Sequence, residues 1–370
     1  MQVNSLYLDG FRNYESFCAE FSDRVNIIVG NNAQGKTNLL EALFFLTSGR
    51  SFRGVKGDRD LIAFHRDEAE IQARVYSRGR EQTLQAHLSR ARRRRLYAND
   101  VKLRTAADLS GRLTAVLFCP DDLEIIRGGP ALRRRLLDHT LCQLRPRYAQ
   151  ALQEYTRLLE HKARILRDYR EKPSLLSTLE DFNERLIETG AEIISVRAAY
   201  TALLSRIAAR VHGEFSSGAE ELAVTYKTVK TIENPQQKPA ALIPFLRQHQ
   251  ESHLRAELET GQCLSGPHKD DLEILINGLP ARTFASQGQA RTAALSIKLA
   301  EREIHFEDRW EYPVLLLDDV LSELDERRRN FVLNHIGLGQ VFITCCSTAD
   351  FAGALEGRVL RIEAGRIVEN

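Results

Sequence analysis

A glycine-rich segment near the N-terminus constrains the fold more than any other feature of this sequence. Residues 30–37 read GNNAQGKT and fit the pattern GxxxxGK[ST]. A short apolar stretch, Val25 to Val29, precedes the segment, and the stretch from Asn38 to Leu46 carries leucines at helical spacing. A strand, a glycine-rich turn and a helix in this order form a phosphate-binding loop. The sequence therefore predicts an α/β protein that holds the phosphates of a nucleotide.

The chemistry of such a loop predicts a role for each of its residues. Lys36 is expected to reach the β- and γ-phosphates of ATP, and Thr37 is expected to place its hydroxyl on Mg²⁺. The preceding residues are expected to turn their backbone N–H groups toward the phosphates at the start of the helix. These cofactor-binding residues are Gly30, Asn31, Asn32, Ala33, Gln34 and Gly35. The alternative, a glycine-rich turn without a ligand, is disfavoured by the flanking strand and helix.

A second apolar stretch ends in two carboxylates. The run from Tyr312 to Leu317 is followed directly by Asp318 and Asp319. A buried strand that delivers an aspartate at its end matches the Walker B arrangement of P-loop ATPases. We expect Asp318 to hold Mg²⁺ and Asp319 to polarise the attacking water, so that Lys36, Asp318 and Asp319 form the catalytic set. A pair of helix-capping residues is the alternative, and the phosphate loop upstream weakens it.

A third element, at residues 284–289, reads FASQGQ and resembles the signature motif of ABC-type ATPases, with Gln287 in place of one glycine. The resemblance implies that Ser286, Gly288 and Gln289 face the γ-phosphate of ATP held by a partner subunit. An ATP-dependent homodimer would follow. The stretch SELD at 322–325 similarly resembles the segment of those ATPases that runs along the dimer interface. A plain serine cap of the following helix, from Gln289 to Glu303, is the alternative for Ser286.

Two departures from the ABC pattern affect the expected rate. The glutamate that usually follows the Walker B aspartate is here Asp319, which is one methylene shorter. The usual switch histidine after the next strand is also missing, and Thr344 is the nearest polar candidate. Slow hydrolysis, suited to a switch rather than a motor, is the expectation.

The remaining chain predicts a helical insertion between two α/β segments. From Leu132 to about Val211 the apolar residues recur at helical spacing, and Pro173 interrupts them, with Ser174 as the predicted N-cap of a second long helix. These two helices suggest a short antiparallel arm. We predict an ATPase lobe at 1–118, a helical lobe with the arm at 119–262, and the C-terminal part of the head at 263–370.

Composition limits the location and the partners. A length of 370 residues suits two compact units. The N-terminus lacks a secretory pattern, and no 18 apolar residues run together, so no membrane contact is expected. Six scattered cysteines without a CxxC pair indicate reduced thiols and a cytoplasmic protein. Because the formal net charge is only +2, DNA binding would have to come from local basic patches.

The spacing of the motifs distinguishes between classes of ABC-type ATPase. Lys36 and Ser286 lie 250 residues apart, which matches the split heads of the SMC and Rad50 group rather than a transporter subunit. The arm of about 80 residues is short for that group, and the chain resembles the RecF family. Three segments carry this resemblance: 120–138 (PDDLEIIRGGP followed by RRR and LD), 265–271 (SGPHKDD) and 316–333.

The resemblance to the RecF family implies an ABC-type P-loop ATPase head, with a mixed sheet split in sequence and an inserted helical lobe. It implies a slow, DNA-linked ATPase of recombinational repair, DNA replication and the SOS response. It also implies binding to double-stranded, gapped or junction DNA, and RecR-type and RecO-type partners that help load recombinase at single-strand gaps. The alternatives are an SMC-like clamp without significant turnover, a transporter-type ABC ATPase subunit and a small-molecule kinase.

Two arginine clusters are candidates for surface chemistry. Arg92, Arg93, Arg94 and Arg95 follow Arg90 closely, and on a strand alternate members would point to opposite faces. They are expected either to contact DNA phosphates or to form a solvated edge that resists aggregation. Residues 133–135, three consecutive arginines, are expected to pair within the molecule.

Overall fold

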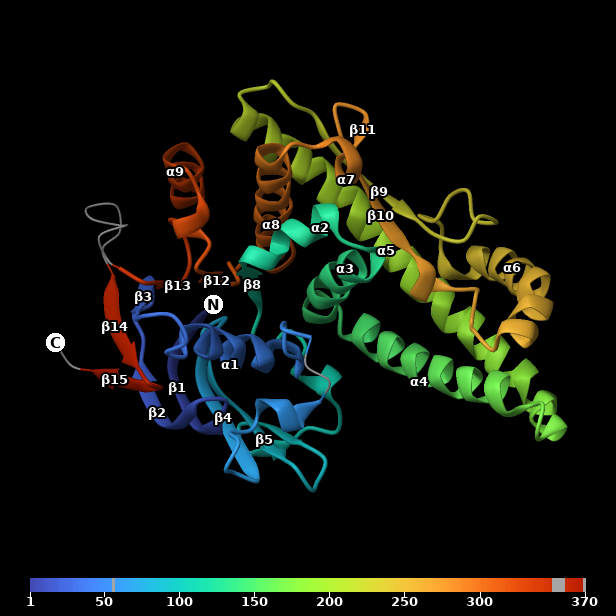
Figure 1. The fold of residues 1–370 in the computed structure, drawn as a ribbon, viewed down its shortest axis with the longest axis horizontal. Helices are drawn as coiled ribbons and strands as arrows, with labels where there is room; N and C mark the ends of the chain where they lie inside the picture. Colours follow the sequence, from blue (N-terminus) through green and yellow to red (C-terminus); the bar gives the residue numbers. More distant parts are fainter. Residues whose placement is uncertain (55–56, 348–356, 369–370) are drawn as a thin grey trace. The chain divides into compact units, whose positions relative to one another are not determined.

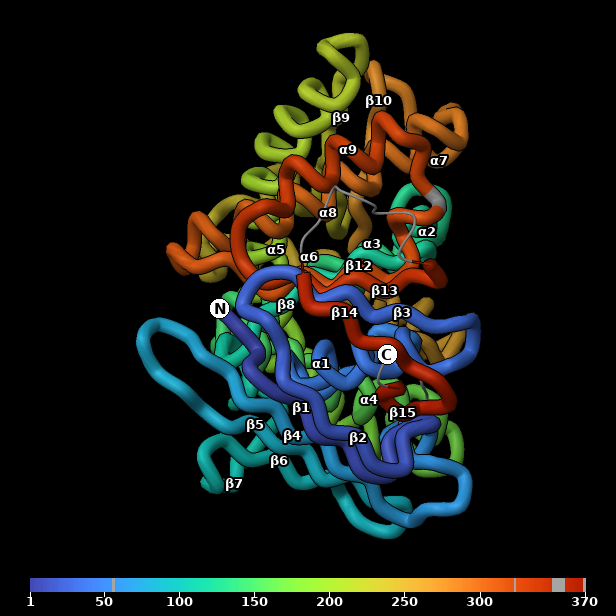
Figure 2. Tube along the Cα trace, turned by 90° about the vertical axis from the view of Figure 1, so that its left-hand side faces the viewer, coloured from blue at the N-terminus to red at the C-terminus, as the bar shows by residue number. Residues whose placement is uncertain are grey.

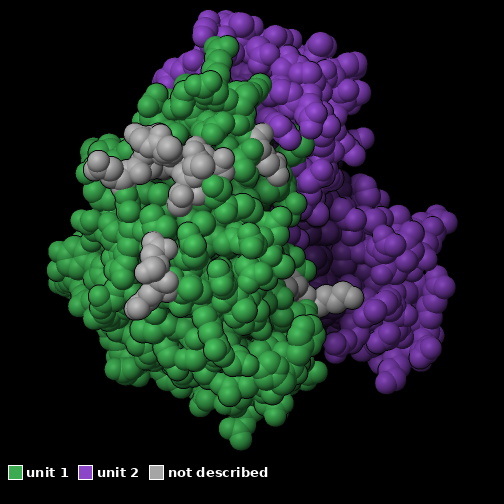
Figure 3. All heavy atoms as spheres, turned by 60° about the vertical axis from the view of Figure 1, so that its left-hand side comes forward, with its two compact units in different colours: residues 1–123, 294–370 green, residues 124–293 purple. Residues whose placement is uncertain are grey.

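The computed structural model describes residues 1–54, 57–347 and 357–368. The chain divides into two compact units, which Figure 3 distinguishes by colour. Unit 1 consists of Met1–Leu123 together with Ala294–Asn370, and unit 2 consists of Glu124–Ala293. The first unit is therefore built from both ends of the chain, as the positions of the phosphate loop and the acidic pair predict.

A mixed sheet of mostly parallel strands carries the nucleotide motifs of unit 1. Its strand order is β15-β14-β3-β13-β12-β8, in which only β15 runs antiparallel to its neighbour. Nearly every residue of its central strands is buried and apolar, as expected for a parallel sheet. The strands are β3 (Val25–Val29), β8 (Ala115–Phe118), β12 (Val314–Asp318), β13 (Val341–Cys345), β14 (Arg358–Glu363) and β15 (Arg366–Val368).

A second sheet of unit 1 is antiparallel and has the order β2-β1-β4-β5-β6-β7. Buried and exposed side chains alternate along its strands. Asn99 and Asp100, which both have positive φ, form the turn that connects β6 to β7. The strands are β1 (Gln2–Phe11), β2 (Tyr14–Glu20), β4 (Glu68–Ser77), β5 (Arg80–Ser89), β6 (Arg95–Ala98) and β7 (Val101–Lys102).

Helix α1 (Lys36–Ser48) lies between these two sheets (Figures 1 and 2). It is apolar on nearly all sides, which suits a helix covered on both faces. Leu40 of α1 belongs to one core with Ile71 of the antiparallel sheet and Leu316 of the parallel sheet. This packing holds the N-terminus of α1 next to the ends of β3 and β12.

The other helices of unit 1 are short or shared. Helix α8 (Gln287–Arg309) begins in unit 2 and continues into unit 1, and α9 (Glu326–His335) follows the acidic pair. The 3-10 helices of the unit are η1 (Asp58–Leu61), η2 (Ala106–Leu109), η3 (Pro120–Asp122) and η6 (Leu321–Glu323).

Unit 2 is mostly helical and contains the predicted antiparallel arm. Helices α4 (Pro146–Asp168) and α5 (Leu179–Ser216) run side by side in opposite directions. His161 near the end of α4 stacks on Phe182 near the start of α5, and the earlier Glu154 of α4 pairs with the later Arg185 of α5. The other elements are α2 (Leu123–Arg127), α3 (Pro130–Leu144), η4 (Pro173–Thr178), α6 (Pro239–Thr260), η5 (Pro267–Lys269), α7 (Ala281–Phe284), and the sheet β11-β10-β9 with β9 (Leu222–Lys227), β10 (Asp271–Ile276) and β11 (Leu279–Pro280).

Two local predictions for the arm are wrong. Ser174 does not cap the second long helix, because residues 173–178 form a 3-10 helix and α5 begins only after Thr178. The first stretch is also not one helix, since Arg145 separates α3 from α4. Arg145 is extended at φ −130°, the conformation that a following proline favours.

The two units differ from the predicted domain limits mainly at residues 263–293. The sequence predicts that they belong to the C-terminal part of the head, whereas the structure groups them with unit 2. The reason is strand pairing, because β10 pairs with β9 along its whole length. The first predicted limit, at 118/119, lies close to the division between Leu123 and Glu124.

None of the described helices is long and apolar enough to cross a membrane. All six cysteines are free thiols.

Candidate active site

The glycine-rich loop connects β3 to α1 and depends on glycine at two positions. Gly35 has φ 114°, and a Cβ there would lie 2.7 Å from Asn13 Nδ2. A Cβ on Gly30 would lie 2.4 Å from the carbonyl oxygen of Ile362. Tyr14 also donates a hydrogen bond to the Gly35 carbonyl at 2.9 Å. The loop is therefore held tightly from outside, in the shape that lets its backbone surround an anion.

Lys36 is buried at the base of this loop. Its ammonium donates to the carbonyl of Gly30 at 2.7 Å and to that of Asn31 at 3.2 Å. It also lies 4.0 Å from Asp319 Oδ2. Phosphate oxygens would be stronger, charged acceptors at the same place. Lys36 therefore occupies the position that the sequence predicts for a phosphate contact.

The structure brings Thr37 and Asp318 together from opposite ends of the chain. Thr37 Oγ1 donates to Asp318 Oδ1 at 2.8 Å, across a sequence separation of 281 residues. Burial raises the pKa of Asp318 above its ordinary value, and the hydrogen bonds from Thr37 and Thr344 act against this. Two adjacent oxygen ligands beside a phosphate loop fit Mg²⁺, which is usually held by one or two carboxylates together with substrate phosphates.

Asp319 has an unusual backbone conformation. Its φ of 52° lies in the left-handed region, which residues other than glycine rarely adopt. Its N–H donates to Thr344 Oγ1 at 2.9 Å. The carboxylate atom Oδ1 is buried and has no hydrogen-bond partner among the described residues. A strained residue with an unused acceptor next to the phosphate loop suits a group that acts on a bound molecule.

The structure changes the interpretation of the missing switch histidine. Thr344, the predicted candidate, is buried in β13 and contacts the Asp318 carboxylate and the backbone N–H of Asp319 rather than the phosphate loop. Cys346 is the side chain that faces the loop. Its Sγ lies 3.7 Å from Lys36 Nζ and donates to Asn32 Oδ1 at 3.2 Å. The sequence TCCS could not show which of its members faces the loop.

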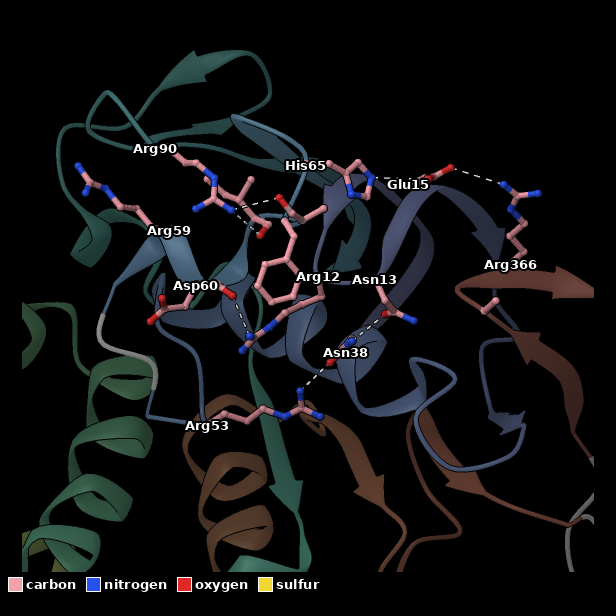
Figure 4. A pocket seen from close by; sticks show the side chains of 14 residues that line it. Arg12, Asn13, Glu15, Asn38, Arg53, Arg59, Asp60, His65, Arg90 and Arg366 are labelled. Carbon is pink, nitrogen blue, oxygen red and sulfur yellow. Dashed lines mark hydrogen bonds and ion pairs between the residues drawn. The ribbon is translucent and has the colours of Figure 1, made fainter.

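A cavity of about 880 Å³ adjoins the phosphate loop (Figure 4). Asn13 links the two, because it lines the cavity, donates to the Gln34 carbonyl at 3.0 Å and accepts from Asn38 Nδ2 at 2.7 Å. Arg12 lines the same cavity and makes a two-point contact with the buried Glu41. Sequence reasoning missed Arg12 and Asn13, because they lie in a turn after β1 that belongs to no motif that we recognised.

Ser286 caps helix α8 within unit 2. Its Oγ accepts from Gln289 N at 3.2 Å, and Gln289 Oε1 accepts from Ser286 N at 2.9 Å, which together form a capping box. Gln289 also donates to Glu220 at 2.9 Å. The helix begins at Gln287, two residues before the predicted start, with Gly288 in its first turn. Ser286 itself is exposed, so its contact with a partner's nucleotide stays a prediction.

Comparison with known proteins decides the family. A family model for the RecF/RecN/SMC N-terminal domain matches residues 2–364. The DNA replication and repair protein RecF of Clostridium acetobutylicum is 37% identical over 372 residues, and the alignment covers 100% of both chains. RecF of Acetivibrio thermocellus is 38% identical over 368 residues and covers 99% of each.

The chain belongs to the RecF family.

Solved structures agree with this assignment. A RecF–ATP structure, described as the recombination mediator protein of the RecFOR pathway, matches with a TM-score of 0.91 and 34% identity. The match covers 100% of this chain and 97% of that one. The Smc head of Pyrococcus furiosus matches with a TM-score of 0.54 and 18% identity over 99% of this chain and 95% of that one, which shows a shared fold. The predicted head with an inserted helical lobe is therefore confirmed.

The arginine cluster of this RecF-family chain does not lie on one strand. Residues 90–94 form the connection between β5 and β6, and only Arg95 is in a strand. Arg90 donates to three backbone carbonyls, and Arg94 donates to the Gly49 carbonyl and to Asp58. Arg92, Arg93 and Arg95 are exposed. DNA contact by this cluster stays a prediction, and Arg94 has a role within the molecule.

Arg133 and Arg134 of the second cluster pair within the molecule, as predicted, whereas Arg135 is exposed. Arg133 is buried and contacts both carboxylate oxygens of Asp271, at 2.6 and 2.9 Å. Arg134 donates to the Asp270 carbonyl at 2.6 Å. These contacts join the segments 120–138 and 265–271, which both carried the resemblance to the RecF family. The charged residues of these two segments therefore stabilise the fold of unit 2.

Proposed function

We propose that the chain is an ATP-dependent DNA-binding protein of recombinational repair and replication-fork maintenance. ATP binding closes a homodimer on DNA, and slow hydrolysis opens it. One observation carries the proposal. The hydroxyl of Thr37 and the carboxylate of Asp318 lie 2.8 Å apart, at the mouth of a loop that is shaped for phosphate. Membership of a family of replication and repair proteins agrees with it.

The residues of the site divide the work of hydrolysis. Lys36 and the N–H groups of residues 30–37 bind and orient the phosphates of ATP. Thr37 and Asp318 would hold Mg²⁺, which neutralises charge on the phosphates. Asp319 orients the attacking water and accepts its proton. Because Asp319 is shorter than the usual glutamate, it reaches the water less closely, and turnover is slow.

The cavity beside the loop is suited to the base and ribose of the nucleotide. Asn13 and Asn38 connect it to the phosphate loop through hydrogen bonds. The ring of Phe64 lines the cavity and is fully exposed, which leaves a face on which a purine can stack. Asp60 and His65 supply polar groups at the rim.

The start of α8 supplies the contact between two copies. The N-terminus of α8, where the capping serine is exposed, carries the partial positive charge of the helix dipole. Ser286, Gly288 and Gln289 would therefore meet the γ-phosphate of ATP in the other subunit. DNA, in double-stranded, gapped or junction form, would be held through exposed arginines such as Arg93 and Arg95.

The partners and the location follow from the family. A solved relative acts as a recombination mediator in the RecFOR pathway, and we infer RecR-type and RecO-type partners for this chain. Recombinase loading at single-strand gaps is the implied outcome. A protein that acts on chromosomal DNA in this way is cytoplasmic in a bacterium.

ATP titration of Lys36→Ala tests the proposal. Loss of two charge-assisted hydrogen bonds, each worth about 1.5–3 kcal/mol, should weaken ATP binding by at least about 100-fold. Lys102→Ala, which removes an exposed lysine from β7, is the matched control and should bind ATP like the native chain. Equal affinity in both variants would refute the phosphate-loop assignment. Single-turnover hydrolysis with and without DNA then separates a switch from a clamp that never turns over.

A further inference from the structure

One hydroxyl group joins the carboxylate of Asp318 to the backbone N–H of Asp319 in the candidate active site. Thr344 Oγ1 accepts the N–H of Asp319 at 2.9 Å and donates its own hydrogen to Asp318 Oδ1 at 3.0 Å. The carbonyl of Leu317 is a more distant acceptor, at 3.5 Å. Since a hydroxyl has a single hydrogen, the shorter contact to Asp318 is the one that it makes. Both hydrogen-bonding functions of Thr344 are thus used on the acidic pair.

The backbone of Asp319 needs such support. A non-glycine residue in the left-handed region persists only where its surroundings hold it there. Asp319 follows the last residue of β12, so no strand partner fixes its N–H. Thr344 is the neighbour of Asp318 in the register of β13, which places its hydroxyl beside the first peptide beyond the strand. The Asp319 N–H therefore finds its acceptor on the adjacent strand.

We propose that Thr344 is a positioning residue that holds Asp319 in its left-handed conformation and so directs its carboxylate at the attacking water. The inference rests on the proposed function, because it assigns Thr344 a role in ATP hydrolysis. Thr344 does not replace the switch histidine, since it touches neither Lys36 nor the loop carbonyls in the described contacts. It acts through Asp319 and has no contact with the reacting atoms.

Packing alone does not require this hydroxyl. Thr344 is buried in a strand whose other residues are Val341, Phe342, Ile343 and Cys345, all apolar. Valine has nearly the same shape as threonine and is at least as favourable in a buried strand. A threonine at this position thus places a polar group where the fold needs only volume. The two contacts with the acidic pair are the reason that the structure offers.

Three variants separate positioning from stability. Thr344→Val removes the hydroxyl and keeps the volume, whereas Thr344→Ser keeps the hydroxyl. Thr114→Val is the matched control. Thr114 is also buried and directly precedes β8 of the same sheet, and its hydroxyl donates to Met1 Sδ at 3.4 Å, away from the acidic pair. ATP affinity, the rate of single-turnover hydrolysis and the midpoint of thermal unfolding are measured for each.

The expected result is a selective loss of rate. Thr344→Val should hydrolyse ATP about 100-fold more slowly, the scale of a misplaced catalytic group, while its ATP affinity changes by less than about threefold. Thr344→Ser should recover most of the rate, and Thr114→Val should hydrolyse ATP normally. The inference is overturned if Thr344→Val keeps the native rate. It is also overturned if the serine and valine variants lose equal activity, or if ATP affinity falls together with the rate.

A double variant tests whether Thr344 acts through Asp319. In an Asp319→Asn background, Thr344→Val should slow hydrolysis by less than about threefold, because residues that act as a unit are not additive. A full additional 100-fold loss would contradict the inference. The single variant Asp319→Asn separates this inference from the proposed function. If Asp319→Asn retains the native rate, the catalytic assignment itself fails. If Asp319→Asn is inactive while Thr344→Val is normal, only the role of Thr344 fails.

Discussion

Replacing Asp319 by glycine should make the protein less active and, compared with the alanine variant, more stable. Asp319 has φ 52°, and a left-handed backbone costs an L-residue with a Cβ roughly 1–2 kcal/mol. Glycine relieves this strain but loses about 0.5–1 kcal/mol through the greater freedom of the unfolded chain. These two ranges differ by about 0–1.5 kcal/mol, so Asp319→Gly should exceed Asp319→Ala in stability by about 0.8 kcal/mol at their midpoints, or about 2–3 °C in Tm.

The comparison of glycine with alanine isolates the backbone. Both variants remove the carboxylate, whose Oδ1 has no hydrogen-bond partner among the described residues and whose Oδ2 lies 4.0 Å from Lys36, so these effects cancel. Glu307, exposed within α8, is the matched control. There the order reverses, and Glu307→Gly should be less stable than Glu307→Ala by about 1 kcal/mol.

Thermal unfolding and single-turnover hydrolysis give the two measurements. Both Asp319 variants should bind ATP and fail to hydrolyse it at the native rate. The reasoning is refuted if Asp319→Ala is as stable as Asp319→Gly, since the strain would then be absent. Hydrolysis at the native rate in either variant would show that another group activates the water.

Three further predictions concern other parts of the molecule. Lys162→Met should destabilise the protein by about 3–5 kcal/mol in urea unfolding, because the buried Glu257, with which Lys162 pairs at 2.6 Å, loses its partner. Lys227→Met breaks the exposed pair with Glu273 and should cost less than about 1 kcal/mol in the same assay. Burial lowers the pKa of His268 to about 4. As the pH falls, His268 therefore takes up a proton in the unfolded state before it does so in the folded state. Up to about 3 kcal/mol of stability should be lost between about pH 6.5 and pH 4, and His268→Gln should flatten that slope. Arg93→Ala combined with Arg95→Ala should reduce the salt dependence of DNA binding. Arg185→Ala combined with Arg255→Ala removes the same charge from ion-paired positions and should not reduce it. If both double variants show the same slope of affinity against salt concentration, the cluster is only a solvated edge.

The parts of the site with a local pattern could be predicted from sequence. The loop at 30–37 lies between a strand and a helix that carry their own periodicity, and its glycines reflect backbone demands that are confirmed at Gly35. The acidic pair was equally visible at the end of an apolar run. Its approach to Thr37 could be expected only because both motifs belong to one known arrangement.

The parts that depend on distant contacts could not be predicted. Arg94 looked like its neighbours in sequence, yet it alone of residues 92–95 reaches Asp58 and the Gly49 carbonyl. Lys162 lies near the C-terminal end of α4, where a cation suits the helix dipole, and it is buried against Glu257 from another helix. In both cases charge was visible in the sequence, but the partner that satisfies it comes from another segment of the chain.

The central claim is that ATP joins two copies of this chain through Lys36 of one and Ser286 of the other. Analytical ultracentrifugation with ATP tests it most directly, using the native chain, Ser286→Arg, Lys36→Ala and a mixture of the two variants. The native chain should dimerise with ATP, and neither variant should do so alone, although Ser286→Arg should still bind ATP. The mixture should recover dimers, because one of its two sites combines an intact loop with an intact serine. The claim is contradicted if Ser286→Arg alone dimerises with ATP as the native chain does.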